Sequence, residues 1–146
     1  MNWKNEAIRK LKHYKHMCQC LESIPKELEQ LELDNQALHR QPPQIVSTPS
    51  GFSRNREDAM LNNIVHRQEL ELALQQATLW VQTVDGALSV LDPTSRELLL
   101  AVYAEEDVPH VPDLCRRLGL ERTTFYRKKD AALACFTLGL YGLIES

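Results

Sequence analysis

Cationic side chains gather in one short stretch of the sequence, between residues 116 and 129. The lysines and arginines there face a single acid, Glu121, although the whole chain of 146 residues has a formal net charge of −3. They are Arg116, Arg117, Arg122, Arg127, Lys128 and Lys129. Ammonium and guanidinium groups bind phosphate, and guanidinium groups also hydrogen-bond base edges. A local basic patch on an acidic chain therefore favours contact with nucleic acid through one confined surface.

The same stretch has the spacing of two short helices joined by a tight turn. The letters VPDLCRRL are followed by Gly119 and by a second helical pattern that opens at Glu121. Leu114 and Leu118 are four residues apart, so they share one face of the first helix. Gly119 follows at the point where a left-handed backbone is wanted. This is the layout of a helix-turn-helix motif.

The second helix of this motif is expected to have an apolar back and a polar front. Its inward residues are Phe125, Ala132 and Phe136, at spacings of seven and four. A helix of this size fits the major groove, with its N-terminal residues nearest the base edges. We expect base reading by Arg122, Thr123, Tyr126 and Arg127, and phosphate binding by Arg116, Arg117, Lys128 and Lys129. The simpler alternative is a small helical subdomain whose basic face is only solvated.

The last third of the chain resembles region 4 of bacterial sigma factors. The likeness is carried by Leu91-Asp92-Pro93, Arg96-Glu97, Tyr103 and LCRRLGLERTTFYRKKDAAL. With its helical first half and the segment NREDAMLNNIV, the chain is similar to phage-encoded late-transcription regulators of the RinA and ArpU type. This resemblance implies a phage or prophage activator of late genes in a bacterial host. Host RNA polymerase is a further candidate partner. Glu121 and Lys128 depart from the sigma pattern, which usually has serine or a similar capping residue and an aliphatic residue there.

Upstream of the motif the sequence predicts a long helical hairpin. Apolar residues at three-four spacing predict a helix over residues 2–22. Pro25 predicts a kink or break near Ser23-Ile24, because proline lacks an N–H group and clashes with the preceding turn. A second helical stretch then runs to about His39. Residues 41–53 contain three prolines and a glycine, so they predict a loop.

The helix expected after this loop spans residues 54–91 and carries two apolar stripes. One stripe is Leu61, Val65, Leu72 and Leu79, and the other is Leu70, Leu74, Val81, Val84, Leu88 and Leu91. A helix of roughly 55 Å needs packing along its whole length. The first helix can cover one stripe, and either the C-terminal helices or a second copy of the chain must cover the other. We expect a coiled-coil-like homodimer through the N-terminal helices, an arm over residues 1–91 and a helix-turn-helix domain over residues 92–146.

The C-terminal tail is apolar on nearly all sides. Its apolar residues are Leu133, Phe136, Leu138, Leu140, Tyr141, Leu143 and Ile144. We expect it to pack on the helix that contains Leu98, which follows a break at residues 92–94. A tail that binds a partner is the alternative.

Several classes of function are disfavoured. No phosphate-binding loop, catalytic carboxylate pair or nucleophile motif is present in the sequence, so we expect neither an enzyme nor a cofactor. His13, His16 and Cys20 could share a helix face, but they lack a second ligand pair, so no metal site is expected. The four cysteines fit free thiols in a reducing cytoplasm, and no apolar run approaches the roughly 20 residues of a membrane span.

The sequence thus predicts an all-α protein that binds double-stranded DNA and regulates transcription. Two alternatives remain. One is an adaptor that docks on RNA polymerase without reading DNA, and the other is a small DNA-packaging (terminase) subunit.

Overall fold

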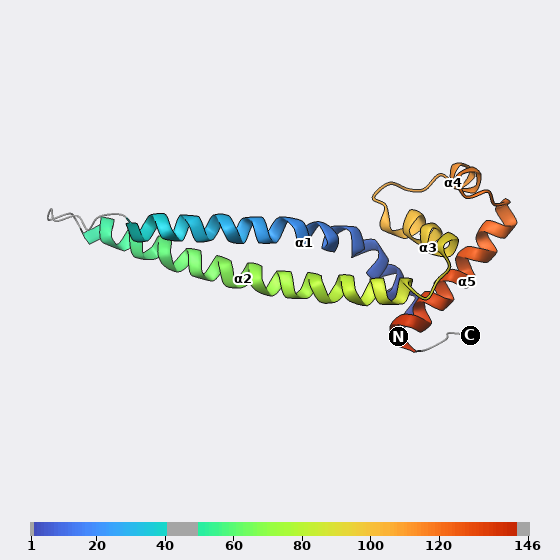
Figure 1. The fold of residues 1–146 in the computed structure, drawn as a ribbon, viewed down its shortest axis with the longest axis horizontal. Coiled ribbons are helices and arrows are strands. Elements are labelled where there is room, and N and C mark those ends of the chain that lie inside the picture. Colours follow the sequence, from blue (N-terminus) through green and yellow to red (C-terminus); the bar gives the residue numbers. More distant parts are fainter. Residues whose placement is uncertain (1, 41–49, 143–146) are drawn as a thin grey trace. The chain divides into compact units, whose positions relative to one another are not determined.

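The computed structural model describes residues 2–40 and 50–142, with side chains from residue 55 onward in the second range. All the elements in these ranges are helices, which confirms the all-α class (Figure 1). They are α1 (Trp3–Arg40), α2 (Ser50–Leu88), α3 (Pro93–Leu99), the short π-helix η1 (Leu100–Ala104), α4 (Val111–Leu118) and α5 (Arg122–Tyr141).

The chain divides into two compact units. The first comprises residues 1–18 together with residues 78–146, and the second comprises residues 19–77. Helices α1 and α2 therefore each contribute turns to both units. The domain boundary expected at residues 91–92 falls inside the first unit.

In the second unit, the segments of α1 and α2 lie side by side and run in opposite directions (Figure 1). Asn63 is buried between them, and its Nδ2 atom donates a hydrogen bond of 2.9 Å to the Leu31 carbonyl oxygen. An ion pair of 2.9 Å joins Arg67 Nη1 to Glu32 Oε2. Because a buried amide must meet one particular carbonyl, Asn63 fixes the register of the two segments.

Of the kink or break expected near Ser23-Ile24, the break is wrong, because α1 continues from Trp3 to Arg40 with Pro25 inside it. Pro25 itself is exposed to solvent. Ile24 next to it is buried. Burial of Ile24 stabilises the helix at this point and can offset the local cost of a proline within it.

Helix α2 also differs from its predicted bounds. It begins at Ser50 rather than Arg54 and ends at Leu88 rather than Leu91. Residues 50–53 of the expected loop are therefore helical, and residues 41–49 lie outside the described residues. The early end has a clear cause in Arg96, whose guanidinium donates hydrogen bonds to the carbonyl oxygens of Leu88 and Leu91 at 3.3 and 3.1 Å.

The two apolar stripes predicted on α2 have different environments. One stripe is covered: its residues Val81, Val84, Leu88 and Leu91 are buried, and Leu70 and Leu74 are half-buried. The other stripe, which contains Leu61, Val65, Leu72 and Leu79, is exposed to solvent. Helix α1 and the C-terminal helices thus cover the same stripe, instead of one stripe each, and no described part of the chain covers the other stripe.

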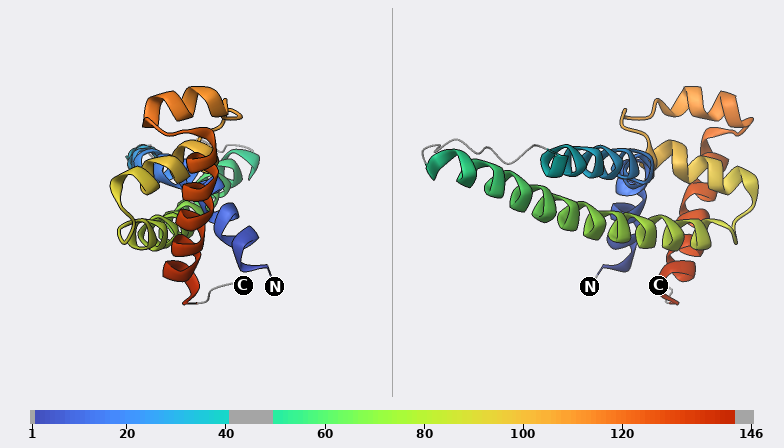
Figure 2. Two further views of the ribbon diagram at one scale, coloured as in Figure 1. Left: turned by 90° about the vertical axis from the view of Figure 1, so that its right-hand side faces the viewer. Right: turned by 60° about the vertical axis from the view of Figure 1, so that its left-hand side comes forward.

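The main core of the first unit joins the end of α5 to the first turns of α1. Phe136 and Leu133 of α5 pack in one buried cluster with Leu11 of α1, Leu88 of α2 and Leu99 of α3. Trp3 and Tyr141 extend this contact, with ring centroids 4.7 Å apart. Figure 2 shows the last turns of α5 beside the start of α1. The described part of the apolar tail therefore packs on α3, as expected, and also on α1 and α2, whereas Leu143 and Ile144 lie outside the described residues.

Gly139 marks the closest approach within this core. A Cβ atom built at residue 139 would lie 3.3 Å from both the Cα and the Cβ atoms of Ala87. The backbones of α5 and α2 are thus in direct contact, and glycine is the residue that allows it.

We expect Phe136→Ala to lower the free energy of unfolding by about 3–5 kcal/mol, because it leaves a cavity where a fully buried ring has been. Leu138→Ala is the control, since Leu138 is exposed on the same helix, and its effect should stay below about 1 kcal/mol. Urea denaturation followed by circular dichroism measures both. Equal losses would contradict the packing of the C-terminal tail described above.

Candidate nucleic-acid interface

The turn between α4 and α5 is built as its residues predict. Gly119 ends α4 with φ 68° and ψ 33°, in the left-handed region. Its N–H group donates to the Arg116 carbonyl oxygen, and the Leu120 N–H group donates to the Cys115 carbonyl oxygen at 2.9 Å. These bonds satisfy two of the carbonyl oxygens that a helix end leaves without partners. The chain can therefore reverse within three residues and begin α5 at Arg122.

A second buried cluster holds α4 against the start of α5. Phe125 is 1% exposed and packs with Leu114 and Cys115 of α4 and with Leu98 of α3. Leu114 and Phe125 are two of the residues whose spacing predicted an inward face, and Leu118, the partner of Leu114 in that spacing, packs partly buried against the same cluster. Because Phe125 is the first large apolar residue of α5, its burial fixes which side of the first two turns faces solvent.

The four residues expected to read bases all lie on that solvated side. Arg122, Thr123, Tyr126 and Arg127 are exposed. The Tyr126 ring meets Phe125 edge to face, with centroids 5.4 Å apart, and Lys129 Nζ lies 5.2 Å from the Tyr126 ring centre. These contacts hold the phenol in place on the surface of α5. In the part of the chain that the structure describes, Arg122 and Arg127 have no ion-pair partner.

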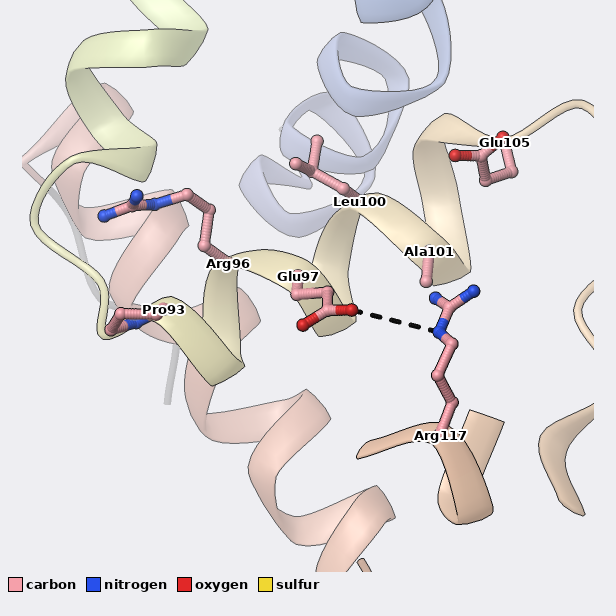
Figure 3. Close-up of a pocket in the computed structure, with 7 residues that line it drawn as sticks. All are labelled: Pro93, Arg96, Glu97, Leu100, Ala101, Glu105 and Arg117. Carbon is pink, nitrogen blue, oxygen red and sulfur yellow. Dashed lines mark ion pairs between the residues drawn. The ribbon is translucent and has the colours of Figure 1, made fainter. Parts of the chain in front are cut away.

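The arginines expected to bind phosphate are exposed but already paired with carboxylates. Arg116 contacts Asp113 within α4, and Arg117 Nε lies 3.9 Å from Glu97 Oε1 of α3 (Figure 3). His110 Nδ1 lies 2.9 Å from the second carboxylate oxygen of Asp113. Arg116, and to a lesser degree His110, hold the pKa of Asp113 below its ordinary value of 3.8. The carboxylate of Asp113 is therefore firmly ionised near neutral pH.

The two lysines of the expected phosphate set are half-buried on the second turn of α5. The charge of Lys128 acts on Asp92, which caps the start of α3 by accepting a hydrogen bond from the Ser95 N–H group. Hydrogen bonds from Ser95 hold the pKa of Asp92 below its ordinary value, and Lys128 adds to that effect.

A shallow cavity of about 450 Å³ lies beside these paired arginines, between α3, η1 and α4 (Figure 3). Glu97 and Arg117 face each other across it, and Glu105 lies at its rim. Sequence reasoning missed the roles of Glu97 and Asp113 as partners of the arginines. The spacing of Asp113 and Arg116 on one helix was a usable signal, but nothing local links Glu97 to Arg117.

Other sites considered from the sequence receive no support from the geometry. Among residues 2–40 and 50–142, no three histidine, cysteine or acidic side chains are grouped so as to hold a metal ion. The same residues include no helix that is both long and apolar enough to cross a membrane. Of the four cysteines, Cys115 is buried, Cys135 is exposed, and all are free thiols.

Comparison with known proteins gives no relative for this chain. No protein-family model matches it, and neither a curated protein nor a solved structure matches it significantly. The function is therefore argued from the geometry of the interface and from the resemblance of its residues to known motifs.

We expect Gly119→Ala to lower the free energy of unfolding by about 1–2 kcal/mol, because alanine is strained at φ 68°. Gly86→Ala is the matched control. Gly86 lies inside α2 with open space around its Cα atom, so the same change there should raise the free energy of unfolding by roughly 0.5–1 kcal/mol. Opposite signs in urea denaturation would confirm the strained turn, and two gains would contradict it.

Proposed function

We propose that this protein is a sequence-specific regulator of transcription that binds double-stranded DNA through α5. The observation that carries the proposal is the exposed start of α5, where the guanidinium groups of Arg122 and Arg127 have no carboxylate partner among the described residues. A core side chain, Phe125, fixes the orientation of this face. Cationic groups on the first turns of a rigid helix have the chemistry that major-groove reading requires.

The four exposed residues have complementary roles in the proposed complex. Arg122 and Arg127 each offer two parallel N–H donors, which match the O6 and N7 acceptors of guanine. Thr123 offers a hydroxyl and a methyl group, and Tyr126 offers a phenol held by Phe125. Lys128, Lys129, Arg116 and Arg117 bind the flanking phosphates and fix the register of α5 on the duplex.

The biological setting is proposed from the resemblance alone. The likeness to sigma region 4 and to RinA- and ArpU-type regulators supports an activator of late genes, encoded by a phage or prophage and acting with RNA polymerase in the bacterial cytoplasm. Glu121 precedes α5 without a side-chain capping hydrogen bond, in keeping with its departure from the sigma pattern.

We also propose that a second copy of the chain covers the exposed stripe of α2. Within the second unit, Leu61, Ile64, Val65 and Leu72 are each at least 42% exposed and lie on one side of α2. Val65 and Leu72 are one heptad apart, which is the period of a helix that packs against another long helix. A two-fold dimer would present two reading helices to two half-sites.

One observation favours the adaptor as a second candidate function. Val108 is 93% exposed and directly follows the three acids Glu105, Glu106 and Asp107. An exposed apolar side chain beside carboxylates suits a basic protein surface better than it suits DNA.

Arg127→Ala tests the reading role. We expect it to weaken binding to the preferred sequence by about 1–3 kcal/mol and to relax the preference at one base pair, because a bidentate contact is lost. Titration of genomic fragments flanking the gene, at two salt concentrations, measures both effects. Lys129→Ala is the control, since loss of a phosphate contact should weaken binding to all sequences alike and flatten the salt dependence.

The same titration decides between the candidate functions. An unchanged sequence preference in Arg127→Ala removes Arg127 from the reading set. Salt-independent or absent duplex binding by the unaltered protein, together with capture of purified RNA polymerase, selects the adaptor. Ring-shaped oligomers would instead select a packaging subunit.

Leu72→Glu tests the dimer. A charge in the middle of the exposed stripe should convert a dimer into a monomer, because burying an unpaired carboxylate is costly. Light scattering after size exclusion measures the mass. The control is Asn62→Glu, an equal charge change at another exposed position of α2. A monomeric unaltered protein, or equal behaviour of the two variants, would reject the proposed interface.

A further inference from the structure

The two arginines nearest the turn differ from those on α5 in one respect. Arg116 is paired with Asp113, and Arg117 is paired with Glu97, whereas Arg122 and Arg127 have no such partner among the described residues. All four side chains belong to the same compact unit and to neighbouring helices. The structure therefore separates the proposed phosphate-binding arginines from the proposed base-reading ones by the presence of a carboxylate.

These two pairs are not needed to hold the fold together. The side chains of Arg117 and Glu97 are each 57% exposed, and those of Arg116 and Asp113 are 76% and 64% exposed. Ion pairs with this much exposure contribute little to stability, because water and salt screen them. The burial of Phe125, Leu114 and Leu98 holds α3, α4 and α5 together without them.

We propose that Glu97 and Asp113 compete with DNA phosphates for Arg117 and Arg116, and so lower the affinity of the interface for every sequence. The inference rests on the proposed function for its ligand, a duplex, and extends it to two residues that do not touch bases. A phosphate that bonds either guanidinium comes within several ångströms of a second anion, the carboxylate. It must therefore displace that carboxylate or accept its repulsion.

The direction of the effect follows from charge. A guanidinium has five N–H donors, so a carboxylate could in principle hold the side chain and leave donors for phosphate. The repulsion between the two anions remains in that arrangement. At about 6 Å in water and at low salt it corresponds to roughly threefold in affinity for each carboxylate. The carboxylates therefore act as competitors and not as positioning groups.

The test compares Glu97→Gln and Asp113→Asn in the full chain. At low salt each variant should bind both the preferred duplex and an unrelated duplex about threefold more tightly, because the carboxylate that repels a phosphate at the arginine is gone. Fluorescence anisotropy with labelled duplexes measures the dissociation constants. Glu106→Gln is the matched control, since Glu106 is an exposed acid of the same unit that forms no ion pair among the described residues. It reports the effect of removing one negative charge without freeing an arginine.

Two further variants assign the gain to the released arginines. Arg117→Gln in the Glu97→Gln background, and Arg116→Gln in the Asp113→Asn background, should abolish it. Circular dichroism checks that every variant is folded. Gains no larger than that of Glu106→Gln would overturn the proposal. A loss of affinity in Glu97→Gln or Asp113→Asn would also overturn it, because the carboxylates would then position the arginines.

The salt concentration needed for elution from immobilised heparin, a sulfated polyanion without bases, tests the competition independently of sequence reading. Later elution of Glu97→Gln and Asp113→Asn than of Glu106→Gln would support the competition even if no duplex sequence is preferred. In that case sequence reading fails and the competition stands. Equal elution of all three variants, with a clear duplex preference in the unaltered protein, would leave sequence reading in place and reject the competition.

Discussion

The burial of one side of α5 is the constraint on which the rest of the structure depends. Phe125, near its start, enters the cluster formed with α3 and α4, and Phe136, three turns later, enters the cluster formed with α1 and α2. Eleven residues are close to three helical turns, so both rings lie on the same side of the helix. The opposite side of the first two turns is left to solvent. The exposed row of Arg122, Tyr126 and Arg127 is therefore a consequence of core packing.

Local signals predicted the part of the structure around this helix. Gly119, the spacing of Leu114 with Leu118, and the spacing of Phe125 with Phe136 act within about three helical turns, and each has the predicted environment. The features that sequence reasoning missed depend on contacts between distant residues. Arg96 ends α2 by binding the Leu88 and Leu91 carbonyl oxygens, and packing carries α1 through Pro25. A periodic pattern shows that a face is apolar, but it does not show which distant segment covers it.

The electrostatics of the candidate interface depend on which basic side chains have a carboxylate partner, and the composition of the stretch does not show this. In the sequence, the basic residues from Arg116 to Lys129 look alike. In the fold, Arg116 and Arg117 lie beside carboxylates, whereas the arginines of α5 have no carboxylate partner among the described residues. Part of this difference is visible in the sequence, since Asp113 and Arg116 are three residues apart. The pairing of Arg117 depends on the tertiary fold, which places Glu97 of α3 beside α4. The candidate site was thus predictable in its residues but not in its electrostatics.

The close approach of Gly139 to Ala87 restricts how α5 could change during evolution. The backbones of α5 and α2 touch at this point, so a residue with a side chain there requires Ala87 to shift by a few tenths of an ångström. A one-residue insertion or deletion between Tyr126 and Gly139 would rotate one end of α5 relative to the other by about 100°. It would bring a bulkier residue onto Ala87 and turn Tyr126 away from its present direction. The number of residues between Tyr126 and Gly139 is therefore constrained, as are the identities of these two residues.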